Sequence, residues 1–264
     1  VRSIRLMRAD GDVIKCSRED NPELFSLAMG GYGLFGLITD LELDMVPNAR
    51  LTPTYTRMPG ADVGKAFTEA VYATMPWAST SWLGRPVRTP PTDLEAYQEI
   101  VAAVRPDWII ETGSADGGRS LFLASMCELV GHGQVLSIDP NEADDRPRHP
   151  RLSHLTGRPH HQDVADEVHR RVAGGRALVV LGSLVDRHTT SEEFERYSPL
   201  VPVHSYVIIT DTVVNGHPVW AGFGPGPAEA VKQILARNGN FAPDPTMEKY
   251  SLSFNPGGYL RRVR

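Results

Sequence analysis

The chain has 264 residues, and its 27 Lys and Arg residues are outnumbered by 32 Asp and Glu residues. The net charge of −5 argues against a nucleic-acid partner, because binding to a phosphate backbone needs an excess of cationic side chains. No apolar run reaches the roughly 20 residues that span a bilayer, and the first residues lack the apolar core of a signal peptide. We therefore expect a cytoplasmic protein that contacts neither nucleic acid nor membrane.

The first segment of the chain predicts a small α+β unit. Ile4–Met7 and Asp12–Cys16 are typical of strands and flank Ala9-Asp10-Gly11, a hairpin turn signal. A short helix is expected over Pro22–Met29, and a glycine-rich turn then leads into an alternating strand near Ile38. The apolar face of such a small sheet has to be covered by another surface.

Residues 1–73 resemble the second half of the flavin-binding domain of FAD-linked oxidases of the vanillyl-alcohol oxidase type. The resemblance rests on the ADG hairpin, on Asn21–Phe25 and on the glycine turn Gly30–Gly36 that leads into Ile38-Thr39. In that family the corresponding turn lies against the flavin. The family also needs a subdomain that cradles the pyrophosphate and a substrate domain, for which the chain has no room. We therefore do not expect FAD binding, and we interpret this truncated segment as structural or as part of an interface.

Residues 74–92 cluster prolines and turn-forming residues, and we expect them to link the first segment to a catalytic domain over residues 93–264. In that domain strand-like apolar runs alternate with helical patterns, which predicts a Rossmann-like α/β fold around a mostly parallel sheet. The expected strands are Trp108–Glu111, Gln134–Ile138, Arg151–Thr156, Ala177–Leu181, Tyr206–Thr210 and Lys249–Phe254. The expected helices are Thr92–Val104, Gly118–Val130, Gln162–Val172, Ser191–Leu200 and Pro227–Asn238.

The stretch Trp108–Pro140 combines an apolar strand, a glycine-rich turn, an amphipathic helix and a second strand that ends on an acid. Small residues let a ligand approach the backbone, the helix offers free N–H groups, and the acid can hold ribose hydroxyls. The form E-T-G-x-x-x-G-G-x-S is more similar to S-adenosylmethionine (SAM) methyltransferases than to dinucleotide-binding proteins. The candidate cofactor-binding residues, with Asp139 on the ribose and Arg158 at the adenine rim, are Glu111, Gly113, Ser114, Gly117, Gly118, Ser120, Asp139, Gly157 and Arg158.

Residues 82–264 are similar to the cephalosporin hydroxylase family, whose members adopt the SAM-dependent methyltransferase fold and include O-methyltransferases of antibiotic and sugar biosynthesis. The resemblance implies a SAM-dependent O-methyltransferase of secondary metabolism that acts on a hydroxyl of a small natural product. It is carried by separate motifs in the family's order: Trp82-Leu83-Gly84, Asp93-Leu94 with Tyr97-Gln98-Glu99, Ile110–Gly113 with Gly117-Gly118, Ile138-Asp139, Asp211-Thr212 with Asn215–Pro218, Phe223–Pro227, and Phe254–Leu260.

The chain departs from this family where a metal site would be expected. The usual L-D-S-D-H-S-H is replaced by LGSLVDRH over Leu181–His188, and the usual E-D-T is replaced by Thr210-Asp211-Thr212. In the family's magnesium-dependent members these positions would supply three carboxylates, but Gly182 and Thr210 replace two of them here. Asp211 remains as the candidate metal ligand. Magnesium usually takes one or two carboxylates together with substrate oxygens and water, so the single carboxylate of Asp211 suffices only if the substrate chelates the ion. We therefore expect weak or absent metal dependence.

Without a metal, a side-chain base must remove the proton of the acceptor hydroxyl. The candidate catalytic residues are His188, His217 and Asp211, with Asp186 placed to orient either histidine. Two other functions stay open: a methyltransferase fold that no longer methylates and instead catalyses a cyclisation, elimination or isomerisation, and a non-catalytic partner subunit. The added sheet also indicates a homo-oligomer, because uncovered sheet edges invite pairing.

Overall fold

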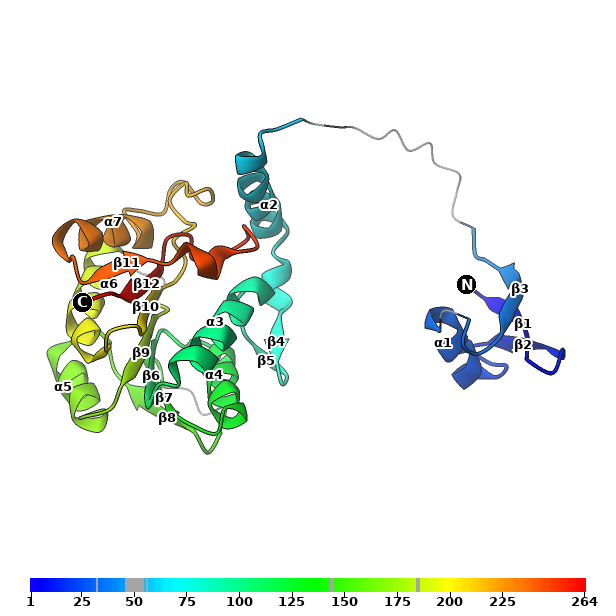
Figure 1. Cartoon of the computed structure of the whole chain (residues 1–264), viewed down its shortest axis with the longest axis horizontal. Coiled ribbons are helices and arrows are strands. Elements are labelled where there is room, and N and C mark those ends of the chain that lie inside the picture. The colour runs from blue at the N-terminus through cyan, green and yellow to red at the C-terminus, as the bar shows by residue number, and fades with distance from the viewer. Residues whose placement is uncertain (32, 46–54, 56, 143–144, 184–185) are drawn as a thin grey trace. The chain divides into compact units, whose positions relative to one another are not determined.

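The computed structural model describes residues 1–31, 33–45, 55, 57–142, 145–183 and 186–264. These residues form two compact units, Val1–Arg57 and Met58–Arg264 (Figure 1). The division falls ahead of residues 74–92, so helix α2 (Gly60–Thr74), which the sequence grouped with the first segment, belongs to the second unit. Among the helices that the structure describes, none has the length and apolarity needed to cross a bilayer.

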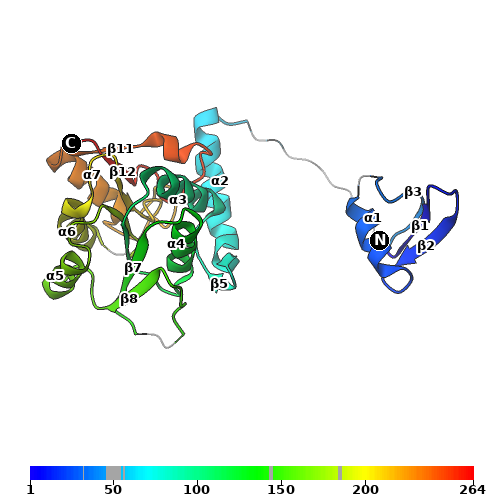
Figure 2. The same cartoon turned by 60° about the horizontal axis from the view of Figure 1, so that its bottom comes forward.

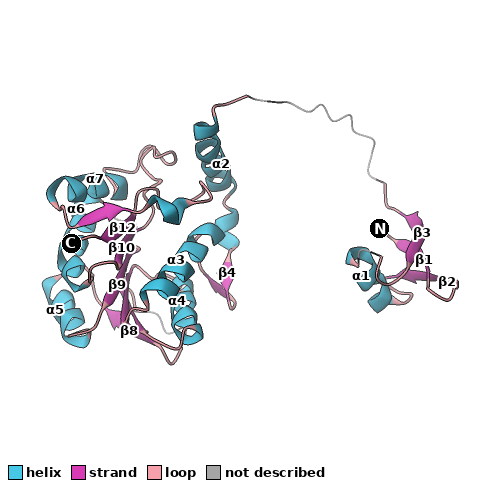
Figure 3. Cartoon of the chain, viewed as in Figure 1, coloured by secondary structure: helices cyan, strands magenta, loops and turns pink. Residues whose placement is uncertain are grey.

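The first unit is a three-stranded antiparallel sheet, in the order β2-β1-β3, packed against one helix (Figure 3). Its elements are β1 (Ser3–Met7), β2 (Val13–Ser17), α1 (Pro22–Gly30) and β3 (Leu37–Glu42). The expected hairpin and helix are present, and Phe25 of α1 packs on apolar residues of β1 and β2. Gly36 (φ +135°) lies between the turn after α1 and strand β3. Its backbone lies so close to β1 that a Cβ there would be 2.5 Å from the Met7 carbonyl oxygen.

The second unit is built around a seven-stranded sheet in the order β11-β12-β10-β9-β6-β7-β8. Strands β10, β9, β6, β7 and β8 are parallel, whereas β12 runs antiparallel to β10 and to β11. The strands are β6 (Trp108–Thr112), β7 (Gln134–Asp139), β8 (Leu152–Thr156), β9 (Ala177–Leu181), β10 (Tyr206–Ile209), β11 (Phe241–Pro243) and β12 (Tyr259–Arg262). The predicted α/β fold with a mostly parallel sheet is confirmed.

Helices cover both faces of this sheet (Figure 2). They are α3 (Pro91–Val104) and α4 (Gly118–Leu129) on one face and α5 (Gln162–Arg171), α6 (Arg187–Tyr197) and α7 (Pro227–Arg237) on the other. Successive strand residues alternate between the two layers: Ile109 packs with α3 and α4, and Ile110 packs with the other three helices. Because both faces are buried, the loops at the carboxyl ends of the strands are left to form a site.

Residues 74–92 also form structure within the second unit. They include a 3₁₀ helix (Pro76–Ser79) and a short hairpin of β4 (Ser81–Trp82) and β5 (Arg85–Pro86). The Trp82 ring packs edge-on against Phe122 of α4, with ring centroids 4.9 Å apart, and its Nε1–H donates to Ser125 Oγ at 3.0 Å. These contacts attach the hairpin to the helix that follows the glycine turn.

Two local predictions are wrong. The strand expected over Lys249–Phe254 is a loop after a 3₁₀ helix (Pro245–Glu248), and the antiparallel strands at this edge are β11 and β12. The backbone N–H of Phe254 donates to Asp93 of α3 instead of to a strand. Helix α6 begins at Arg187 instead of Ser191, because the Asp186 carboxylate accepts hydrogen bonds from the first N–H groups and caps the helix.

Candidate active site

The predicted glycine turn joins β6 to α4, and neighbouring protein atoms require its glycines, because a Cβ on Gly113 or Gly117 would lie 2.5 Å from Ser183 or Pro147. Gly113 (φ +64°) and Gly117 (φ +76°) both lie in the left-handed region, which side chains disfavour. The Gly117 N–H donates to the Ser114 carbonyl oxygen at 2.8 Å and closes the turn. Helix α4 begins at Gly118, so its free N–H groups lie beside the carboxyl end of β6.

Glu111 and Ser120, two of the predicted cofactor-binding residues, face one another in the interior. The Glu111 side chain is fully buried, and one of its oxygens accepts a hydrogen bond from the Ser120 hydroxyl. Its other oxygen accepts a hydrogen bond from Arg119 Nε at 2.6 Å. These bonds fix the first turn of α4 against β6. Glu111 and Ser120 therefore hold the two ends of the glycine turn together from within the core.

Asp139 ends β7 and bonds to the glycine turn. Its Oδ2 accepts a hydrogen bond from the Ala115 N–H at 3.1 Å, and its Oδ1 accepts one from the Asn141 N–H at 2.9 Å. A carboxylate has about four lone-pair positions, so two remain for ribose hydroxyls. The Gly157 N–H donates to the Asp139 carbonyl oxygen at 3.0 Å, which places the end of β8 alongside, and Arg158 follows as an exposed side chain.

Arg119 is the site residue that sequence reasoning missed, although it stands at the variable position of the G-G-x-S motif. Its side chain is only 11% exposed, and its guanidinium lies over the ends of β6 and β9. Nη2 is 3.3 Å from the Gly113 carbonyl oxygen, and a Cβ on Gly182 would come within 1.6 Å of the same nitrogen. A side chain at position 182 and this arginine conformation therefore exclude one another.

Asp211 lies just beyond the end of β10, two residues after Ile209. Its backbone is in the left-handed region (φ +58°) and is held there by the Asn255 side chain, whose Oδ1 accepts the Asp211 N–H at 3.0 Å. Burial raises the pKa of Asp211, while the hydrogen bond from Thr210 and the charge of Arg119 oppose that rise. Asp211 and Arg119 both line a crevice of about 20 Å³. A carboxylate with a raised pKa is a stronger proton acceptor than an exposed one.

A buried network around Asp93 supports this crevice. Asp93 accepts hydrogen bonds from the Ser253 hydroxyl at 2.6 Å and the Tyr259 hydroxyl at 2.7 Å. Burial raises the pKa of Asp93 to about 6 against these bonds. The Asn255 amide donates to the Tyr259 hydroxyl at 3.3 Å, and its Oδ1 accepts the Asp211 N–H, so Asn255 joins the network to Asp211. Asp93, Asn255 and Tyr259 belong to the family motifs of the sequence, which gave no signal that they meet, and Ser253 lies outside those motifs.

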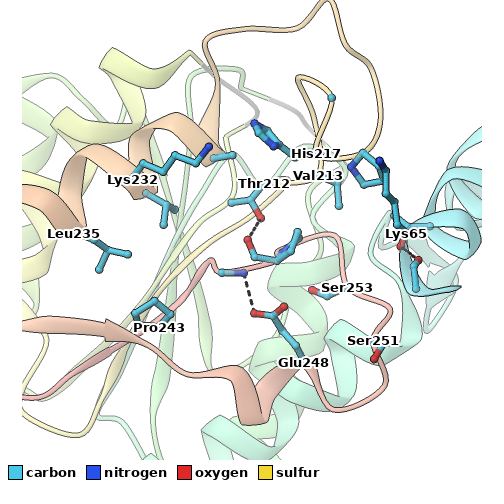
Figure 4. Close-up of a pocket in the computed structure, with 18 of the residues that line it drawn as sticks. Lys65, Thr212, Val213, His217, Lys232, Leu235, Pro243, Glu248, Ser251 and Ser253 are labelled. Carbon is cyan, nitrogen blue, oxygen red and sulfur yellow. Dashed lines mark hydrogen bonds between the residues drawn. The ribbon is translucent and has the colours of Figure 1, made fainter. Parts of the chain in front are cut away.

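The structure places His217 and Asp211 in the linings of different cavities. His217 lines a separate cavity of about 750 Å³, together with Thr212 and with lysines on α2 and α7 (Figure 4). Its Nε2 is 2.7 Å from Glu229 Oε1. Burial works to raise the pKa of Glu229, but the hydrogen bonds from His217 and from the Gly226 N–H prevail and hold it at about 2. Asp211 is not among the residues that line this cavity.

His188 and Asp186 do not form the pair that was expected. His188 is exposed in the first turn of α6. Asp186 Oδ1 accepts the backbone N–H of His188 at 2.7 Å and that of Thr189 at 3.1 Å, so it serves as the helix cap and does not orient an imidazole. Residues 184 and 185 of the altered motif lie outside the described part of the chain.

A protein-family model described as Rhamnosyl O-methyltransferase/CmcI matches residues 74–263. The chain belongs to this family. The predicted family is thereby confirmed, and the chain is a SAM-dependent methyltransferase.

Relatives and solved structures agree with this assignment. The rhamnosyl O-methyltransferase of Mycobacterium leprae is 28% identical over 211 residues, which are 77% of this chain and 92% of that protein. The one from Mycobacterium tuberculosis is 26% identical over 212 residues, covering 77% and 86%. A structure of CmcI with magnesium and SAM matches with a TM-score of 0.56 at 16% identity, covering 82% of this chain and 89% of that one. This likeness confirms the fold.

The N-terminal part has a separate, partial match. Cytokinin dehydrogenase 9 of Oryza sativa subsp. japonica is 39% identical over 51 residues, which are 19% of this chain and 10% of that protein. The match agrees with the predicted resemblance to a fragment of an FAD-linked oxidase.

Proposed function

We propose that the chain transfers the methyl group of SAM to a hydroxyl oxygen of a small natural product, such as a sugar hydroxyl of a glycoside. The observation that carries this proposal is the order of groups along the carboxyl edge of the sheet. Asp139, Gly113, Gly182 and Asp211 stand at the ends of β7, β6, β9 and β10, which are consecutive neighbours. A nucleoside held at Asp139 therefore extends along the edge toward Asp211.

The cofactor would be held mainly by backbone groups. The residues of the glycine turn allow its approach, the free N–H groups of α4 add the positive end of the helix dipole, and Asp139 accepts the ribose hydroxyls. Gly157 and Arg158 border the adenine beyond Asp139. SAM supplies a methyl group on a positively charged sulfur, and the transfer requires the acceptor oxygen in line with it.

Asp211 is the residue we assign as the general base. Its carboxylate lies at the end of β10, its backbone is fixed by Asn255, and its raised pKa favours proton acceptance. The acceptor hydroxyl gives its proton to Asp211 as the oxygen forms its bond to the methyl carbon and the sulfur–methyl bond breaks.

The residues at this edge do not fit a resident magnesium ion. Among the described residues no group of three His, Cys, Asp or Glu side chains is arranged to hold a metal. Asp211 has Thr210 and Gly182 as neighbours where other carboxylates would be needed, and the guanidinium of Arg119 fills the space over Gly182. The resemblance implies three carboxylates at these positions in magnesium-dependent members of the family. This chain has one carboxylate, Asp211, beside the fixed positive charge of Arg119.

Two measurements test the proposal. Calorimetric titration should show binding of SAM and of its product S-adenosylhomocysteine (SAH), and the absence of binding for both would rule the proposal out. Mass analysis of rhamnosylated glycosides after incubation with SAM should then show the gain of one methylene unit. A bound cofactor together with an altered acceptor of unchanged mass would instead support a cyclisation, elimination or isomerisation.

A further inference from the structure

The guanidinium of Arg119 lies in the middle of the carboxyl edge of the sheet. Its Nε donates to Glu111 at 2.6 Å, and its Nη2 lies 3.5 Å from the Thr112 carbonyl oxygen and 3.3 Å from that of Gly113. These last two bonds are long for N–H···O contacts, whose usual range ends near about 3.2 Å. Nη1 forms no hydrogen bond with any residue that the structure describes. Arginine has five N–H donors, so this one keeps donors for a ligand.

The place of Arg119 in its helix is electrostatically unusual. It is the second residue of α4, and a cation in the first turn opposes the positive end of the helix dipole. The first turn of α4 has no acidic residue, and Glu111 on β6 is the carboxylate that pairs with the guanidinium. The guanidinium and the free N–H groups of the helix therefore act together on the same space. An anion there would be stabilised by both.

We propose that Arg119 binds the carboxylate of the amino-acid part of the bound cofactor. This inference rests on the proposed function. With the ribose at Asp139 on β7 and the reacting methyl group facing Asp211 just beyond β10, the amino-acid part lies over β6 and β9, where the guanidinium is. SAM and SAH carry no phosphate, so the anion they bring to this place is the α-carboxylate. Nη1 and Nη2 can hold it as a pair of parallel hydrogen bonds.

Gly182 provides the space that this role requires. A Cβ at position 182 would lie 1.6 Å from Nη2 and 2.5 Å from Cζ of Arg119. Its backbone is not in the left-handed region, so glycine is required here by space and not by conformation. The Thr112 carbonyl oxygen, 2.7 Å from the same Cβ position, limits that space together with Arg119. The missing side chain at position 182 therefore leaves room for the guanidinium of the arginine in the first turn of α4.

The test compares two ligands that differ only in the amino-acid part. Calorimetry would measure the affinities of SAH and of methylthioadenosine, which keeps the nucleoside and the thioether but has no carboxylate. In Arg119→Ala the affinity for SAH should fall by about 10- to 100-fold, the effect of removing a charged hydrogen-bond pair, while that for methylthioadenosine stays within about threefold. Arg119→Lys should lose less. Arg237→Ala, which removes an exposed arginine on α7, should leave both affinities unchanged.

The outcomes separate this inference from the proposed function. Equal affinity changes for both ligands in Arg119→Ala, or no change for SAH, would overturn the role of Arg119 while leaving the cofactor site in place. Failure of the wild-type chain to bind either ligand would remove the proposed function and this inference with it. If Arg119→Ala does not fold because Glu111 is left unpaired, wild type and Arg119→Lys are compared with SAH and its decarboxylated analogue. An equal preference for SAH in both proteins would then contradict the inference.

Discussion

Thr112 and Glu193 form a hydrogen bond in the interior directly below the glycine turn. The Thr112 hydroxyl donates to Glu193 Oε2 at 2.8 Å, and its oxygen accepts the backbone N–H of Gly182 at 3.2 Å. One threonine thus connects the ends of β6 and β9 with helix α6. Glu193 itself is only 1% exposed, and burial raises its pKa to about 7 against the hydrogen bonds from Thr112 and Ser183.

This carboxyl makes the stability of the fold depend on pH. Its folded pKa of about 7 exceeds the ordinary value of 4.5, so the folded state holds the proton more tightly than the unfolded state. The stability contributed by the protonated group is therefore complete below pH 4.5 and lost as the pH rises toward 7. Glu193→Gln keeps the hydrogen-bond acceptor and removes the charge. Thermal unfolding at pH 8 should show this variant melting roughly 5 °C above wild type, with little difference at pH 4.5.

Glu195→Gln is the matched control for that experiment, because Glu195 is exposed on the same helix. It should leave the melting temperature unchanged at both pH values. A wild-type protein whose stability is the same at pH 5 and pH 8 would show that Glu193 is not the protonated group described above.

Asp211→Asn tests the general base. The amide keeps the size and the hydrogen bond to Thr210 but cannot accept the acceptor proton. We expect kcat to fall by about 10²- to 10⁴-fold, with the affinity for SAH retained. Burial raises the pKa of Asp211, so its carboxylate becomes protonated at a pH above the ordinary aspartate value of about 4. The wild-type kcat should therefore decline as the pH falls through this raised pKa. Full activity in the variant would exclude Asp211 as the base.

Asp139→Asn tests the ribose contact and should behave differently from Arg119→Ala. Asp139 is placed to hold the part of the ligand that SAH and methylthioadenosine share, so both affinities should fall by a similar factor, about 10-fold or more. Calorimetry with the two ligands measures this ratio. An effect restricted to SAH would mean that Asp139 does not contact the nucleoside.

Chelation of divalent cations should leave methyl transfer intact. The edge of the sheet offers the guanidinium of Arg119 where a metal would need carboxylates, so rates measured with and without a strong chelator are expected to agree within about twofold. A loss of activity that added magnesium restores would show that the acceptor itself completes a metal site with Asp211.

His217→Gln should affect the reaction less than Asp211→Asn does. His217 pairs with Glu229 and lines the larger cavity, whereas Asp211 lines the crevice beside Arg119. Steady-state kinetics should show kcat within about 10-fold of wild type for the histidine variant. A loss as large as that of Asp211→Asn would move the base to the histidine and the acceptor to the cavity of Figure 4.

Local features of the site could be predicted from the sequence, because the strand, glycine turn, helix and terminal acid follow one another along the chain. The contact between Arg119 and Gly182 could not, because it joins the first turn of α4 to the end of β9, and these two segments meet only once β6 and β9 pair in the sheet. His217 and Asp211 show the converse: they are close in sequence, yet left-handed residues at Asp211 and Asn215 turn the chain so that the two side chains line different cavities.

The C-terminal edge was the least predictable part of the fold. The stretch Lys249–Phe254 alternates in polarity like a strand, but its polar groups bond to Asp93 on a helix distant in sequence. The true strand β12 follows Asn255–Gly258, whose proline and glycines indicate a turn and mask the strand beyond them. Long-range hydrogen bonds therefore decided the structure against the local pattern.

The crevice beside Asp211 has a volume of about 20 Å³, enough for one water molecule and far too small for a sugar ring. Segments that are distant in sequence line it together, among them Arg88–Pro90 and Phe254 with Asn255. We expect these segments to move apart when an acceptor approaches the carboxylate. Asn255 also accepts the Asp211 N–H, so a movement of Asn255 that lets the acceptor in would also change the backbone position of Asp211. We therefore expect the opening and reclosing of this crevice to contribute to the rate of turnover.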